Sequence, residues 1–95
     1  MPHTVLVEVP CLDGKARELL QVLLPALVDT RAFKGCELVE AYIGADNPDL
    51  VVLWEKWATQ ADQEAYLAWR AETGVDLIGP FKAGDPRFVH LMAAD

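Results

Sequence analysis

The chain is short of basic residues, and this shortage limits the partners that it can bind. Only 8 lysines and arginines stand against 15 aspartates and glutamates, which gives a net charge of −7 at pH 7. Proteins that bind nucleic acids draw most of their affinity from basic side chains that neutralise phosphates. We therefore expect no nucleic-acid partner and no attraction to anionic membrane surfaces.

Cysteine is also scarce. The sequence has only two, Cys11 and Cys36, and they form no C-x-x-C pair. Two cysteines cannot build a disulfide framework, so we expect a cytoplasmic protein in a reducing environment. The first residues lack the basic and apolar stretches of a signal peptide, and no apolar run approaches the roughly 18 residues of a membrane span. We therefore expect neither a signal peptide nor a membrane helix.

Motifs that bind metals or phosphates are missing as well. The histidines and cysteines are His3, Cys11, Cys36 and His90. Along a straight strand, His3 and Cys11 lie about 26 Å apart, from eight residues at roughly 3.3 Å each. The sequence has no H-x-x-x-H pair, glycine-rich phosphate loop or G-x-S-x-G motif. We therefore expect no metal site and no cofactor.

Apolar residues, in contrast, are abundant and make up 53% of the 95 residues. This length corresponds to a single domain over residues 1–95. The apolar share exceeds the average of about 45–50% for globular domains. The excess predicts an interface or a ligand cavity in addition to an ordinary core.

Hydrophobic periodicity and turn residues predict four strands and two helices. The strands are expected at residues 4–9, 36–43, 50–57 and 86–93. The order β-α-β-β-α-β predicts an α+β, ferredoxin-like fold, in which an antiparallel sheet carries both helices on one face.

The helices are predicted from their caps and their apolar stripes. The first is expected from Gly14 to Asp29 with Asp13 as its N-cap, and Pro25 falls on its solvent face. The second is expected at residues 59–73, with a cap at its first residue and Gly74 after its end. Residues 75–85 have room for one short helical turn.

The strand at residues 50–57 is apolar on both faces. Val51, Leu53, Glu55 and Trp57 point one way, and Leu50, Val52, Trp54 and Lys56 point the other way. Two helices can cover only one face of the sheet, and the other face is too apolar for water. We therefore expect a homodimer that pairs the open sheet faces of two copies.

Three segments carry a family resemblance over almost the whole chain: Asp13-Gly14-Lys15, Phe33-Lys34-Gly35-Cys36 and Leu53-Trp54-Glu55-Lys56-Trp57. They resemble the antibiotic biosynthesis monooxygenase (ABM) domain family of the dimeric α/β-barrel superfamily. The resemblance implies a homodimer whose protomers each hold a pocket between helices and sheet. Enzymatic relatives oxidise aromatic polyketides or quinols with O2 and no cofactor, and others degrade haem.

Cofactor-free oxygenation needs a phenol in a dry pocket, a base that takes its proton, and aromatic walls. We predict His90, Tyr66 and Glu55 as catalytic residues, and Trp57, Trp69 and Leu53 as substrate-binding residues. Two of these positions depart from the family pattern. Leu53 stands where antibiotic-tailoring relatives have an asparagine, and Tyr66 stands where the family commonly has a histidine.

The same residues also have structural interpretations. The aromatic side chains can fill a small core, and His90 can be a structural or interface histidine. Glu55, if buried, can form an ion pair with Arg70 or Arg87.

The sequence therefore leaves several functions open. The resemblance favours a monooxygenase that acts on a small phenolic or quinol-type aromatic. The alternative is a non-catalytic dimeric module that binds a small molecule, such as a small aromatic ligand. Haem degradation ranks lower, because neither histidine lies on the second helix. An isomerase or lyase also stays open, since a fold does not fix a function.

Overall fold

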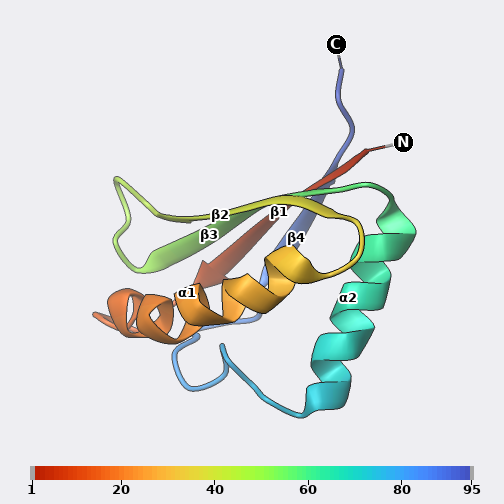
Figure 1. Ribbon diagram of the computed structural model, residues 1–95. Coiled ribbons are helices and arrows are strands. Elements are labelled where there is room, and N and C mark those ends of the chain that lie inside the picture. Colours follow the sequence, from red (N-terminus) through yellow and green to blue (C-terminus); the bar gives the residue numbers. More distant parts are fainter. Residues whose placement is uncertain (1, 95) are drawn as a thin grey trace.

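The computed structural model describes residues 2–94, and its elements follow the order β-α-β-β-α-β (Figure 1). They are β1 (His3–Pro10), α1 (Ala16–Ala32), β2 (Cys36–Ile43), β3 (Leu50–Trp57), α2 (Gln60–Thr73) and β4 (Arg87–Leu91). The sheet order is β2-β3-β1-β4, and each neighbouring pair is antiparallel. Both helices lie on the same side of this sheet (Figure 1). The predicted ferredoxin-like α+β fold is confirmed.

Helix α1 begins later and ends later than the sequence predicts. It starts at Ala16 because Gly14 has a φ of 74°, which a right-handed helix does not accept. The prediction that Asp13 caps this helix is wrong, since no side chain caps it. Asp49 instead accepts a hydrogen bond from the Gly14 N–H at 3.0 Å and holds the turn. Pro25 is exposed, as predicted.

Helix α2 has both predicted caps. The Thr59 hydroxyl accepts a hydrogen bond from the Asp62 N–H at 3.1 Å, and Gly74 ends the helix with a φ of 70°. The following segment makes one turn, in which the Ile78 carbonyl accepts from Phe81 and Lys82. Strand β4 is shorter than the predicted 86–93.

The face of the sheet under the helices, the core face, carries the hydrophobic core. Strand alternation buries Val5, Val7 and Val9 of β1 and Val51, Leu53 and Trp57 of β3. Helix α1 packs against them with Leu19, Leu23 and Leu27, which lie four residues apart on one stripe. The described residues therefore share one continuous core.

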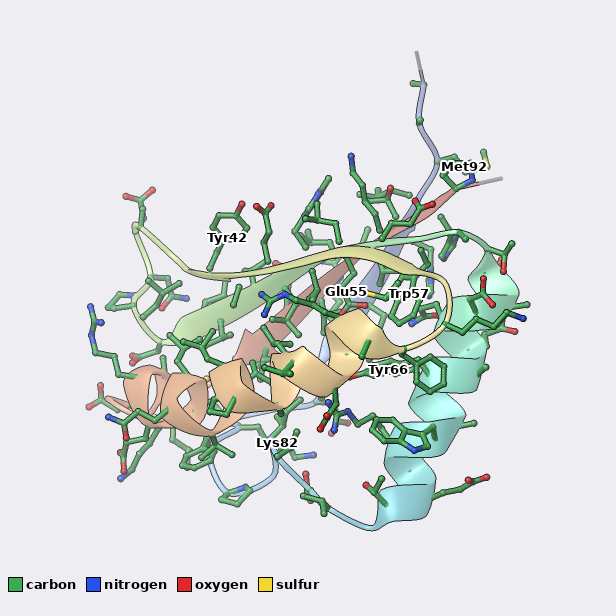
Figure 2. All side chains as sticks on the ribbon, viewed as in Figure 1. Tyr42, Glu55, Trp57, Tyr66, Lys82 and Met92 are labelled. Carbon is green, nitrogen blue, oxygen red and sulfur yellow. The ribbon has the colours of Figure 1, made fainter. Side chains whose placement is uncertain are left out.

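Neither helix lies on the opposite sheet face, the open face (Figure 1). Seven of its apolar side chains are half-buried: Leu6, Leu38, Leu50, Val52, Trp54, Val89 and Leu91. Tyr42 is 51% exposed and projects from this face, whereas Glu55 and Trp57 lie on the helix side (Figure 2). Within residues 2–94, no helix is long and apolar enough to cross a membrane.

Candidate functional site

A cavity of about 430 Å³ lies between the two helices, the core face of the sheet and the segment after α2. Apolar side chains from every one of these elements form most of its wall: Val7, Leu23, Leu27, Leu53, Leu67, Ala71, Val75, Leu77, Ile78 and Phe88. Four polar side chains also line it: Glu55, Tyr66, Arg70 and Asp76. A mostly apolar cavity with a few polar groups is typical of a small-molecule site.

The carboxyl group of Glu55 lies in an apolar environment. Alternation along β3 puts it on the core face between Leu53 and Trp57, and it is only 5% exposed. The Trp57 indole N–H donates a hydrogen bond to its Oε1 at 2.9 Å. Burial raises the pKa of Glu55 above its ordinary value of 4.5, and the bond from Trp57 opposes this rise only in part.

No cation of residues 2–94 forms an ion pair with Glu55, so the predicted pairing with Arg70 or Arg87 is wrong. Arg87 points to the other side of the sheet, where its Nη1 lies 3.4 Å from Glu8. Arg70 directs its Nε and Nη2 donors to Tyr66, Ala26 and Thr30 and not to Glu55. The Glu55 carboxyl is therefore buried with no positive charge beside it in residues 2–94. This environment disfavours the ionised form and favours the protonated form.

Arg70 and Tyr66, one turn apart on α2, form a hydrogen-bonded network with the end of α1. The Arg70 Nε–H donates to the Tyr66 hydroxyl at 2.8 Å, and Nη2 donates to the Ala26 carbonyl at 2.8 Å and to Thr30 at 3.1 Å. The Tyr66 and Thr30 hydroxyls share a hydrogen bond of 2.6 Å. The network ties the two helices together beside the cavity and fixes both side chains that line it.

The predicted aromatic walls lie mostly behind the cavity. Trp57 has no exposed surface, and its ring centroid is 5.1 Å from that of Tyr66. Phe33 packs between Tyr66 and Trp69, with centroid distances of 5.4 and 5.6 Å. Neither Trp57 nor Trp69 lines the cavity, whereas Leu53, Glu55 and Tyr66 do. The aromatic cluster thus supports the wall from behind, and Tyr66 is its member on the cavity side.

His90 lies outside this cavity. It pairs with Val5 across β1 and β4, and it is exposed. Its Nδ1 is 2.8 Å from Nε2 of His3, so the two histidines form a pair. Phe88, two residues earlier on the same strand face, does line the cavity. No group of three or more histidine, cysteine, aspartate or glutamate side chains in residues 2–94 is arranged to hold a metal ion.

Sequence reasoning missed two parts of the site. Thr30 is not among the predicted site residues, although it extends the stripe of Leu23 and Leu27 beyond the predicted end of the first helix. Residues 75–78 belong to the segment for which the sequence predicts only one short helical turn, and the apolar side chains of Val75, Leu77 and Ile78 are the signal that could indicate a cavity wall. The spacing of Tyr66 and Arg70, four residues apart on a helix, was also a usable signal.

The sequence profile of the family described as antibiotic biosynthesis monooxygenase (ABM) matches residues 2–75. The chain belongs to this family. The resemblance read from the sequence is thereby confirmed. No match is found among curated protein sequences.

Solved structures related to this ABM protein share its fold. Rv0793 from Mycobacterium tuberculosis is 25% identical, with a TM-score of 0.75 over 100% of this chain and 97% of that chain. A proposed antibiotic biosynthesis monooxygenase from Nitrosomonas europaea is 19% identical, with a TM-score of 0.82 over 98% and 90% of the two chains. Another from Caulobacter crescentus is also 19% identical, with a TM-score of 0.82 over 99% and 91%. These likenesses extend over the whole ABM fold.

Proposed function

We propose that this ABM protein is a cofactor-independent monooxygenase that oxidises a small phenolic or quinol-type aromatic with O2 in the cavity beside Glu55. One observation carries the proposal: a buried carboxyl that has no counter-ion among residues 2–94 lines an apolar cavity of about 430 Å³. Such a group has a raised pKa, and a base with a pKa nearer to neutral is better matched to a phenol. Family membership supports the reaction class.

The reaction can be written with only substrate, O2 and the carboxyl. The Glu55 carboxylate takes the proton of the phenol, and the phenolate passes one electron to O2. The resulting phenoxyl radical and superoxide combine at the para carbon, and the peroxide takes the proton back. Loss of the para hydrogen with cleavage of the O–O bond releases water and leaves a quinone. One oxygen atom enters the product and the other leaves as water.

The other predicted residues have different places in this proposal. Tyr66 lines the cavity and is held by Arg70 and Thr30, so it can position the substrate. Leu53 contributes apolar wall, and Trp57 orients Glu55 through its indole N–H. His90 does not reach the cavity, and its catalytic role stays a prediction. The His90→Ala variant tests that role.

The test is O2 consumption with 1-naphthol, whose para carbon carries the hydrogen that the reaction removes, without any added cofactor and corrected for oxidation without protein. We expect Glu55→Gln to lower kcat by about 10²-fold or more, as loss of a general base does. Glu64→Gln, an exposed glutamate on α2, is the matched control and is expected to keep full activity. A Glu55→Gln protein as active as the control would refute the role of the carboxyl.

The second candidate function is a non-catalytic module that binds a small molecule. It is favoured by Leu53, at the position where tailoring relatives have a polar residue, and by Tyr66 in place of the usual histidine. A ligand that copurifies with the protein and is never turned over would support it. Haem degradation predicts a Soret band on adding haemin, and the absence of both histidines from the cavity wall argues against it.

We further propose that residues 1–95 act as one domain and assemble as a homodimer through the open face. The apolar side chains of that face, Trp54 and Val52 among them, are half-buried in the single chain. Pairing two such faces would remove these side chains from water. Burial of apolar surface stabilises an assembly by roughly 25 cal/mol per Å². A monomer in sedimentation velocity at micromolar concentration would contradict this assembly. The cytoplasmic location also stays a prediction, supported by the free thiols Cys11 and Cys36.

A further inference from the structure

We propose that the cavity selects apolar aromatic ligands that carry an ionised oxygen, and that Arg70 is the residue that binds this oxygen. The inference rests on the proposed function in one respect, that the cavity is the ligand site. It adds the charge of the ligand, which neither the family nor the reaction class specifies.

The first argument is that Arg70 has donors to spare. Its Nε and Nη2 donate to Tyr66, Ala26 and Thr30, whereas Nη1 has no hydrogen-bond partner within residues 2–94. The guanidinium carries five N–H donors in a planar fork. Because Arg70 lines the cavity, a ligand oxygen can reach this side chain from there.

The second argument is the balance of charge along the cavity wall. In the part of the chain that the structure describes, no carboxylate forms an ion pair with Arg70. Glu55 also lines the cavity but forms no ion pair with Arg70, and burial raises the pKa of this carboxyl. Asp76 lines the cavity as well, but it is exposed and accepts a hydrogen bond from the Gly79 N–H at 2.8 Å. Water therefore screens Asp76 more than it screens the guanidinium.

The third argument is that the guanidinium is already fixed. Three hydrogen bonds hold it, and its Cζ lies 4.9 Å from the ring centroid of Trp69 and 5.4 Å from that of Tyr66. A side chain that is ordered before binding loses little further entropy when a ligand arrives. A charge-assisted hydrogen bond to it is therefore worth more than one to a mobile surface arginine.

Together these features describe an apolar cavity with a fixed cation on its wall that forms no ion pair within residues 2–94. A neutral aromatic would fill the cavity but leave the guanidinium without a counter-charge. An aromatic with a carboxylate or an ionised enol would fill the cavity and pair the charge. We therefore assign acidic aromatics as the ligand class.

The test compares two probes of nearly equal shape, 1-naphthoate and 1-naphthamide, by isothermal titration calorimetry at pH 7. We expect 1-naphthoate to bind at least about tenfold more tightly to the native protein. A third probe, 2-hydroxy-1,4-naphthoquinone, is an ionised enol and separates enolate from carboxylate recognition. Equal affinities for the naphthoate and the naphthamide would overturn the inference without any variant.

Variants then assign the preference to one residue. Arg70→Gln is expected to bring the naphthoate-to-naphthamide ratio close to one. Arg70→Lys keeps the charge and is expected to keep part of the ratio, which guards against a Gln variant that does not fold. Arg87→Gln is the control, since Arg87 pairs with Glu8 outside the cavity, and it should leave the ratio unchanged. An unchanged ratio in both folded Arg70 variants would contradict the assignment.

Binding of these probes does not require turnover, so the two proposals can fail separately. If 1-naphthoate binds through Arg70 but no phenol consumes O2, the ligand class stands and the monooxygenase fails. If phenols are oxidised while the naphthoate and naphthamide bind equally, the monooxygenase stands and the role of Arg70 fails.

Discussion

Replacing Glu55 by glutamine should make the protein more stable at neutral pH, and by an amount that depends on pH. The side chain is 5% exposed, has no counter-ion in residues 2–94, and accepts one hydrogen bond from Trp57. Burial raises the pKa of Glu55, so the folded protein holds this proton more tightly than the unfolded chain does. Glutamine has nearly the same shape and can accept the same hydrogen bond, but it carries no proton to lose.

The sign of the effect follows from this shift. The stabilising contribution of the protonated carboxyl is fully present below its ordinary pKa of 4.5 and is lost as the pH rises through the higher pKa of the folded state. Each unit by which the folded pKa exceeds the unfolded one corresponds to about 1.4 kcal/mol. The free energies of unfolding of the native and Glu55→Gln proteins should therefore nearly agree at low pH. They should diverge in favour of glutamine as the pH rises.

The assay is urea unfolding at a series of pH values from about 4 upward, at one fixed protein concentration because an assembly of copies would make stability depend on concentration. Glu64→Gln, the exposed control, should shift the free energy of unfolding by less than about 0.5 kcal/mol at every pH. The reasoning would be refuted if the difference in unfolding free energy between the Glu55→Gln and native proteins changed as little with pH as the difference for the Glu64→Gln control. The carboxyl would then ionise in the fold without penalty, and the basis for its role as a tuned base would be gone.

Three further predictions concern the rest of the molecule. Trp54→Lys, which places a charge on the open face, should shift a dimer towards monomer in sedimentation velocity, and no change would argue against that interface. Gly35→Ala should cost about 2–4 kcal/mol of unfolding free energy, because Gly35 has a φ of 87° and an added Cβ would overlap the Asp62 side chain. Gly74→Ala, with a φ of 70° and open space around it, should cost only about 1 kcal/mol, and equal losses would contradict this difference. Gln63 is 1% exposed, and its Nε2 has no hydrogen-bond partner in residues 2–94. Gln63→Met should therefore raise the free energy of unfolding by about 1 kcal/mol. A lower free energy of unfolding in the same urea assay would contradict this.

The sheet and its two faces could be predicted because strand alternation is a local property. The pattern of β3 puts Leu53, Glu55 and Trp57 on one side and Trp54 on the other, and the structure has them there. The start of α1 could not be predicted in the same way. It depends on the positive φ of Gly14 and on the hydrogen bond that the Gly14 N–H donates to Asp49, a residue 35 positions away.

The candidate site was predictable only in part, because its contacts join distant segments. Glu55 and Tyr66 could be singled out from residue type and position. The hydrogen bond from Arg70 to the Ala26 carbonyl spans 44 positions, and the contact between His3 and His90 spans 87. No periodicity encodes such contacts, and they decide which side chains are paired and which are free.

Trp57 connects the register of the sheet to the chemistry of the site. Its indole has no exposed surface, so a slip of β3 by one residue would carry this large side chain to the open face and bring Lys56 into the core. The same indole donates its N–H to Glu55 and partly offsets the rise in the pKa of that carboxyl. The Glu-x-Trp pair at the end of β3 therefore does two things at once. It fixes which face of the strand meets the helices, and it holds a buried carboxyl at the wall of the cavity.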